Sequence, residues 1–145
     1  MIIIIPLGGT GQRFKNNGYK KPKALINIFG KPILFYLLDC INIENIDYIY
    51  IPYNKEYLEY NLETLLKKNY PHINFKFHLL LTKTRGAAET INIAINNLES
   101  IIDKPVICLD SDNFYLCDII NKWDGNNTIF TFIDKNVSPI YSYIS

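Results

Sequence analysis

The sequence predicts a three-layer α/β/α sandwich built on a mostly parallel, Rossmann-like sheet. Three observations support this: an all-isoleucine run at residues 2–5 that ends at a glycine-rich loop, strand patterns that alternate with helical patterns, and carboxylates directly after a later apolar run. Strands joined by helical crossovers form βα units, in which neighbouring strands are parallel. We expect strands near residues 2–7, 47–53, 74–81, 105–110 and 128–133.

Length and composition fit a single domain over residues 1–145. A chain of this size buries roughly 70% of the surface of its unfolded form, so its core needs no disulfide or metal. The net charge of +1 gives no general attraction to nucleic acid or to a membrane. No apolar run reaches the roughly 18 residues of a membrane span. Cys40, Cys108 and Cys117 form no CxxC pair, so we expect a reduced, cytoplasmic protein.

The first strand and the loop after it predict an anion site. Residues 2–5 offer no polar face, as in a strand buried on both sides, and Pro6 ends the strand. Gly8, Gly9 and Gly11 lack the Cβ atoms that would keep a ligand away from the backbone, so their N–H groups can turn toward an anion. Positive charge follows at Arg13, Lys20, Lys21 and Lys23. Together these features predict a polyphosphate site at the carboxyl edge of the sheet.

Two common phosphate-binding motifs do not fit this loop. A dinucleotide-binding fingerprint needs a glycine three residues after Gly11, where the chain has Phe14. A P-loop needs Lys-Ser or Lys-Thr directly after its last glycine, where the chain has Gln12-Arg13. A glycine-rich turn beside ordinary surface lysines stays open as the simpler interpretation.

A longer, spaced pattern resembles the signature of the sugar-phosphate nucleotidylyltransferases: GGTGQRF at residues 8–14, KPKAL at 21–25 and GKPI at 30–33. These enzymes join an NTP and a sugar phosphate into a nucleotide-sugar and release pyrophosphate; their fold is of the nucleotide-diphospho-sugar transferase type. The resemblance implies that Arg13 holds the departing pyrophosphate and Lys23 the α-phosphate. It also implies a nucleotide-binding backbone at Leu7, Gly8, Gly9, Thr10 and Gly11.

The middle of the chain carries structural signals. Residues 33–41 predict a buried helix that begins near Gly30-Lys31-Pro32, and residues 47–53 alternate as a strand. Asn54 is expected to cap a helix whose apolar face comprises Leu58, Leu62, Leu65 and Leu66. The two histidines have no neighbouring cysteine or carboxylate at a zinc-site spacing, so a zinc site is not expected.

Residues 87–98 predict a helix whose first turn contains small residues. Small residues at a helix N-terminus leave room for a ligand and direct free N–H groups at it. In the family that the chain resembles, this turn lies against the base and ribose, which implies nucleotide contacts for Arg85, Gly86 and Ala87. Where the family often has a Gln or Glu that reads the base, the candidates here are Thr82, Thr84 and Arg85, so the base stays open. Tight helix–sheet packing is the alternative explanation.

Asp110-Ser111-Asp112-Asn113 follows an apolar strand, at the edge where α/β sheets bind ligands. Mg²⁺ prefers one or two carboxylates together with phosphate oxygens. The resemblance implies that Asp112 binds the Mg²⁺, with Asp110 at an ordinarily apolar position. Two alternatives remain: an Asx turn, and the DxD triplet of metal-dependent glycosyltransferases, which lack the glycine loop and the basic residues after it.

Residues 116–123 predict a helix, and a further strand begins at Pro139. Family members normally continue for about as long again, and that second half supplies the sugar-phosphate pocket and a second metal-binding aspartate. We therefore expect the chain to be incomplete at its C-terminus, or to be a nucleotide-binding module without catalysis. The implied partners are an NTP and a sugar phosphate; a homo-oligomer is compatible with the sequence, which names neither base nor sugar.

Overall fold

The computed structural model describes residues 1–98 and 104–131 of the chain, and its centre is a four-stranded sheet in the order β5-β4-β1-β6. All neighbouring strands of this sheet are parallel. The predicted parallel sheet is thereby confirmed, with these strand bounds: β1 (Ile2–Ile4), β4 (Tyr48–Asn54), β5 (Phe75–Leu80) and β6 (Val106–Cys108).

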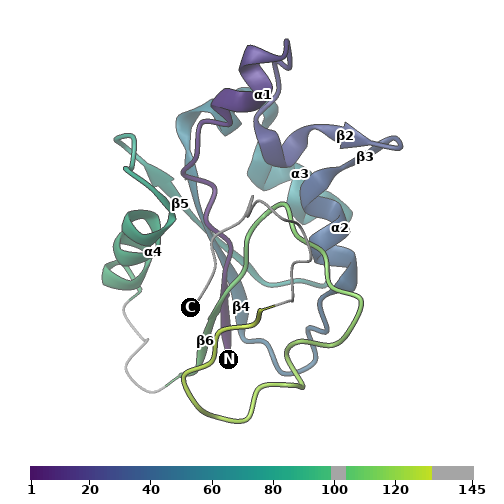
Figure 1. Ribbon diagram of the computed structural model, residues 1–145, viewed down its shortest axis with the longest axis vertical. Helices are drawn as coiled ribbons and strands as arrows, with labels where there is room; N and C mark the ends of the chain where they lie inside the picture. The colour runs from purple at the N-terminus through teal and green to yellow at the C-terminus, as the bar shows by residue number, and fades with distance from the viewer. Residues whose placement is uncertain (99–103, 132–145) are drawn as a thin grey trace, which may run out of the picture.

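Helices cover both faces of the sheet (Figure 1). Helices α2 (Ile33–Cys40) and α3 (Leu62–Asn69) lie on one side, and α4 (Ala87–Asn96) lies on the other. The side chains of β1 alternate between the two cores, because successive side chains of a strand point to opposite faces. Ile3 packs with Leu37 and Leu66, and Ile2 packs with Ala94. The three layers are therefore set by a central strand that is buried on both sides.

The region before α2 differs from the sequence prediction. Gly30-Lys31-Pro32 does not begin a helix but belongs to a hairpin of β2 (Asn27–Ile28) and β3 (Lys31–Pro32). Phe29 and Gly30 form its turn with φ of 49° and 81°. Two positive φ values are typical of the two-residue turns that match the twist of a hairpin. Helix α2 begins at Ile33 with Pro32 as its N-cap, so the helix predicted over residues 33–41 is confirmed.

The helix predicted after Asn54 is split in two. Asn54 caps a 3₁₀ helix, η2 (Lys55–Tyr60), and the chain then passes through Asn61 with φ of 47° before α3 begins. This break rotates the leucines relative to one another. Leu62 and Leu66 are buried as expected, but Leu58 is 49% exposed and does not belong to the core. Two further short helices were not predicted: α1 (Gln12–Asn16) and the 3₁₀ helix η1 (Lys23–Leu25).

The segment after β6 has less regular structure than predicted. Residues 116–123 form turns rather than a helix, because the Asp118 carboxylate accepts hydrogen bonds from the backbone N–H groups of Ile120 and Asn121. Residues 128–131 form no strand, and Ile129 is exposed there. Residues 132 and 133 of that predicted strand, and the strand expected from Pro139, lie outside the described residues.

The strand order determines where loops from distant parts of the chain meet. The connections from β1 lead to β4 on one side and, later, to β6 on the other, so the direction of winding reverses at β1. In open α/β sheets, ligands bind outside the carboxyl ends of the strands at such a reversal. In the part of the chain that the structure describes, no helix has the length and apolar character needed to span a bilayer.

Candidate functional site

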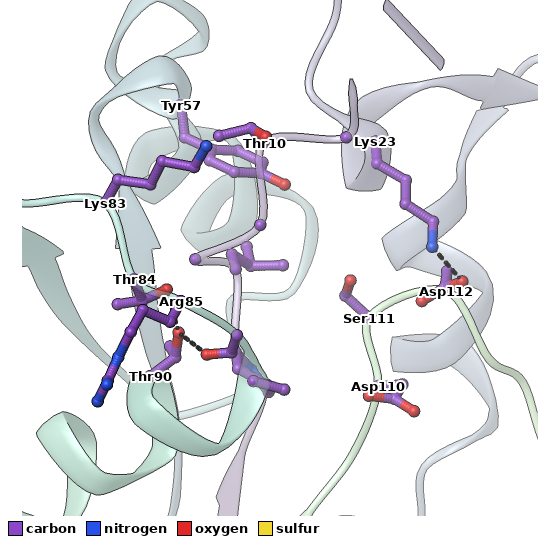
Figure 2. A pocket seen from close by; sticks show the side chains of 17 residues that line it. Thr10, Lys23, Tyr57, Lys83, Thr84, Arg85, Thr90, Asp110, Ser111 and Asp112 are labelled. Atoms are coloured by element: carbon purple, nitrogen blue, oxygen red, sulfur yellow. Dashed lines mark hydrogen bonds and ion pairs between the residues drawn. The ribbon is translucent and has the colours of Figure 1, made fainter. Parts of the chain in front are cut away.

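A cavity of about 370 Å³ opens at the carboxyl edge of the sheet (Figure 2). We call it the main cavity. Its wall comes from the loops after three strands: β1, β5 and β6. Its lining comprises residues 6–11, 83–87 and 110–112, together with Lys23, Tyr57 and Thr90. The cavity therefore lies where the reversal of strand order predicts a ligand site.

The glycine loop, residues 8–11, contributes backbone rather than side chains to the main cavity. Its N–H groups donate no hydrogen bond to the backbone of any other described residue. Gly11 adopts φ of +60°, and a Cβ atom there would lie 3.3 Å from Cβ of Lys23. This glycine thus allows both the left-handed backbone and the close approach of the lysine.

Gly8 is needed for packing against helix α4. A Cβ atom on Gly8 would lie 2.8 Å from the hydroxyl oxygen of Thr84 and still closer to that of Thr90. These two buried hydroxyls hydrogen-bond to each other at 2.8 Å, and the Thr90 hydroxyl donates to the Gly86 carbonyl. A Cβ atom on Gly9, in contrast, would meet nothing within 4 Å. The absence of the Gly8 side chain therefore lets the glycine loop approach the start of α4.

A lysine and a carboxylate meet on the opposite wall of the main cavity. Nζ of Lys23 lies 2.5 Å from a carboxylate oxygen of Asp112, and the two side chains are 35% and 36% exposed. Figure 2 shows this pair across the cavity from Thr84 and Thr90. A half-exposed ion pair of this kind stabilises a protein by about 1 kcal/mol or less. It can therefore open at little cost when a charged ligand binds.

Tyr57 adds a neutral hydroxyl to the site. Burial raises the pKa of Tyr57 well above its ordinary value; a hydrogen bond with the backbone of Ala24 lowers this pKa by less, and the nearby carboxylates of Glu56 and Asp112 raise it further. In Figure 2 its hydroxyl points toward the side of the site where Lys23 and Asp112 lie. The phenol therefore stays protonated at neutral pH and can donate a hydrogen bond.

The two aspartates after β6 differ in their surroundings. The chain turns at Ser111-Asp112, so it does not stay extended past Leu109. Asp112 pairs with Lys23, whereas the Asp110 side chain makes no hydrogen bond or ion pair to a described residue. Within residues 1–98 and 104–131, no group of three or more His, Cys, Asp or Glu side chains could hold a metal by itself. A metal ion at this place would therefore also need oxygen atoms from a bound molecule. Mg²⁺ is commonly bound in this way, by one or two carboxylates together with phosphate oxygens.

Most residues that the sequence assigned to the site line the main cavity: Leu7, Gly8, Gly9, Thr10, Gly11, Lys23, Arg85, Gly86, Ala87 and Asp112. Arg13 does not; it is exposed on α1. The Arg85 side chain is 88% exposed and pairs with Glu89, whose carboxylate also accepts a hydrogen bond from the Arg85 backbone N–H. The loops that the sequence assigned to a ligand site thus meet at one cavity, whereas these two arginine side chains point elsewhere.

Three lining residues, Lys83, Tyr57 and Thr90, are not among those that the sequence singles out. Lys83 follows the carboxyl end of β5, so the expectation that ligands bind at this edge of the sheet would also have pointed to it. Thr84, one of the candidates for reading the base, lines the cavity as well. Tyr57 and Thr90 reach the cavity through contacts between distant elements, and no local motif marks them.

Comparison with known proteins supports the fold. No family model matches the sequence, and no match is found among curated proteins. A nucleoside-diphosphate-sugar pyrophosphorylase from Vibrio cholerae RC9 aligns with a TM-score of 0.63 and 18% identity over 84% of this chain and 52% of its own. A protein assigned as a glucose-1-phosphate thymidylyltransferase from Bacillus anthracis aligns with a TM-score of 0.65 and 20% identity over 84% of this chain and 48% of its own.

The inositol-1-phosphate CTP transferase from T. maritima aligns with a TM-score of 0.62 and 15% identity over 79% of this chain and 44% of its own. This chain thus spans about half the length of the solved structures that it matches. At these identities the likeness concerns the fold: the chain has the fold of the sugar-phosphate nucleotidylyltransferases.

The packing around the glycine loop predicts different responses to the same substitution at adjacent glycines. Gly8→Ala should lower the free energy of unfolding by about 1–3 kcal/mol, because the new methyl group collides with Thr84 and Thr90. Gly9→Ala should change it by less than about 0.5 kcal/mol, since its Cβ would meet open space. Urea unfolding of both variants measures the difference, and equal losses would contradict the packing described.

Proposed function

We propose that this chain is the nucleotide-binding part of a sugar-phosphate nucleotidyltransferase and binds an NTP with Mg²⁺ in the main cavity. One observation carries the proposal: loop amides that have no backbone partner among the described residues, the Lys23 ammonium and the Asp112 carboxylate all lie at one cavity at the carboxyl edge of the sheet. Backbone amides and a lysine suit phosphate oxygens, and a carboxylate beside them suits a hard cation. The fold of the solved neighbours supports the same assignment.

The proposed reaction is attack by a sugar-phosphate oxygen on the α-phosphorus of the NTP, with pyrophosphate as the leaving group. Such transfers depend on positioning and charge neutralisation more than on covalent catalysis. Lys23 would hold the α-phosphate, and the amides of the glycine loop would hold the other phosphates. Arg13 follows the loop on α1 and does not line the main cavity, so its exposed side chain would have to turn toward the glycine loop to hold the departing pyrophosphate.

The carboxylates define where the metal would bind. Asp112 would hold Mg²⁺ together with phosphate oxygens, and the cation would offset the negative charge of the triphosphate. Both aspartates of the DxD triplet line the main cavity, and among the described residues Asp112 is the one that pairs with Lys23. The glycine loop and Lys23, which line the same cavity, favour nucleotidyl transfer over the glycosyltransferase alternative, in which both aspartates would serve the metal.

Pyrophosphate release tests the reaction. The protein is incubated with each NTP, Mg²⁺ and a panel of sugar 1-phosphates, and pyrophosphate is measured with a coupled assay. Release that requires one sugar phosphate supports the proposal, and reactions without a sugar phosphate or without Mg²⁺ provide the background. Hydrolysis of an added nucleotide-sugar, with no pyrophosphate from NTP, would instead identify a glycosyltransferase.

Lys23→Ala should weaken NTP binding roughly tenfold to a hundredfold, the usual effect of losing a hydrogen bond to a charged group. Lys21→Ala is the matched control, because it removes the same charge two positions away, where the side chain lies outside the main cavity. Calorimetry in the presence of Mg²⁺ gives both affinities. Arg13→Ala should also weaken binding, and equal affinities for all four proteins would refute the assigned phosphate site.

The proposed metal ligand predicts a contrast between the two aspartates. Asp112→Asn should sharply reduce the gain in NTP affinity that Mg²⁺ produces, with a change in stability below about 1 kcal/mol, because its ion pair is half-exposed. Asp110→Asn should leave both quantities nearly unchanged, since this side chain has no partner among the described residues. Binding titrations with and without Mg²⁺ test this. Equal losses of metal dependence would indicate a two-aspartate site and favour the glycosyltransferase.

A further inference from the structure

We propose that Asn54 is a positioning residue that turns two amides of the glycine loop toward the phosphates of the nucleotide. This inference rests on the proposed function. Asn54 ends β4, is 8% exposed and does not line the main cavity. It therefore acts on a ligand only through the loop that it holds.

Both the amide nitrogen and the amide oxygen of the Asn54 side chain form hydrogen bonds with backbone groups. Its amide nitrogen, Nδ2, donates to the carbonyl oxygens of Gly8 at 3.3 Å and Gly9 at 2.9 Å. Its oxygen, Oδ1, accepts from the N–H of Glu56 at 2.9 Å, which caps η2. The backbone N–H of Asn54 donates to the Leu7 carbonyl. Only a planar amide offers two donors and an acceptor in this arrangement.

These contacts determine which way the loop amides face. The carbonyl of Gly8 shares a peptide plane with the N–H of Gly9, and the carbonyl of Gly9 shares one with the N–H of Thr10. The described residues contain no cis peptide bond, so each N–H points opposite to its carbonyl. Since both carbonyls face Asn54, both N–H groups face away from it. Gly9 and Thr10 line the main cavity, so the two successive N–H groups form an anion-binding concavity there.

Packing around Gly9 is sparse. Gly8 is held on its other side by Thr84 and Thr90, but a Cβ atom on Gly9 would meet nothing within 4 Å. Glycine loses more conformational freedom on ordering than any other residue. Without Asn54, a bound phosphate would have to order Gly9 and Thr10 itself, and affinity would fall accordingly.

The test separates positioning from stability with a pair of asparagine substitutions. Asn54→Ser keeps a hydroxyl that can cap η2 but removes both donors to the loop carbonyls. Asn74→Ser is the matched control: Nδ2 of Asn74 donates to the Asp47 carbonyl at 2.9 Å, next to the first residue of β4, at the opposite edge of the sheet. Asn54→Asp provides a second variant, because it preserves the cap and the shape while replacing the donors with an acceptor.

The probe is inorganic tripolyphosphate with Mg²⁺, since it binds through phosphate groups alone. Calorimetry should show at least tenfold weaker binding for Asn54→Ser and Asn54→Asp, and less than a twofold change for Asn74→Ser. In the protein without ligand, NMR order parameters of the Gly9 and Thr10 amides should fall in both Asn54 variants and stay unchanged in Asn74→Ser.

The two measurements distinguish this inference from the proposed function. Unchanged affinity and unchanged amide order in both Asn54 variants would overturn the positioning role, even if the wild-type protein binds tripolyphosphate. Failure of the wild-type protein to bind tripolyphosphate or any NTP would overturn the proposed function. In that case the order parameters would still decide whether Asn54 holds the loop.

Discussion

The parallel pairing of β1 with strands on both sides is the constraint on which the rest of the structure depends. Ile2, Ile3 and Ile4 are fully buried, and each has a partner in β4 and another in β6. Because all side chains of this strand pack into the two cores, none of them can contact a ligand. Any ligand contact from this part of the chain must come from the loop that follows the strand. Because all four strands are parallel, the loops after β1, β4, β5 and β6 meet at the same edge.

The sequence predicted those parts of the structure that depend on local pattern. The isoleucine run, the alternating β4 and the helix after Gly86 each carry a clear periodicity, and the structure confirms them. The glycine loop and the Asp110-Ser111-Asp112 segment could be proposed as parts of a site because each comes soon after an apolar strand, and the family resemblance selected Asp112 from that segment. Their meeting at one cavity followed from the expectation of a parallel sheet.

Features that depend on backbone reversals or distant contacts could not be predicted. Pro32 was expected in the first turn of a helix, but the positive φ values of Phe29 and Gly30 make a hairpin before it. Leu58 fits a helical period of 3.6 residues together with the leucines after it. The 3₁₀ helix and the left-handed backbone of Asn61 break that period, so the Leu58 side chain is exposed instead of facing the core. Asn54 was recognised as a cap, but its bonds to the glycine loop join segments far apart in the sequence.

The site separates the groups that hold its shape from the groups that carry charge. The glycine loop is held by uncharged, mostly buried contacts from Asn54, Thr84 and Thr90. Lys23 and Asp112 instead form a half-exposed ion pair. Such a pair contributes about 1 kcal/mol or less to stability, so breaking it costs little. Under the proposed function, a phosphate would replace Asp112 as the partner of Lys23, while the uncharged contacts of Asn54, Thr84 and Thr90 would continue to hold the loop.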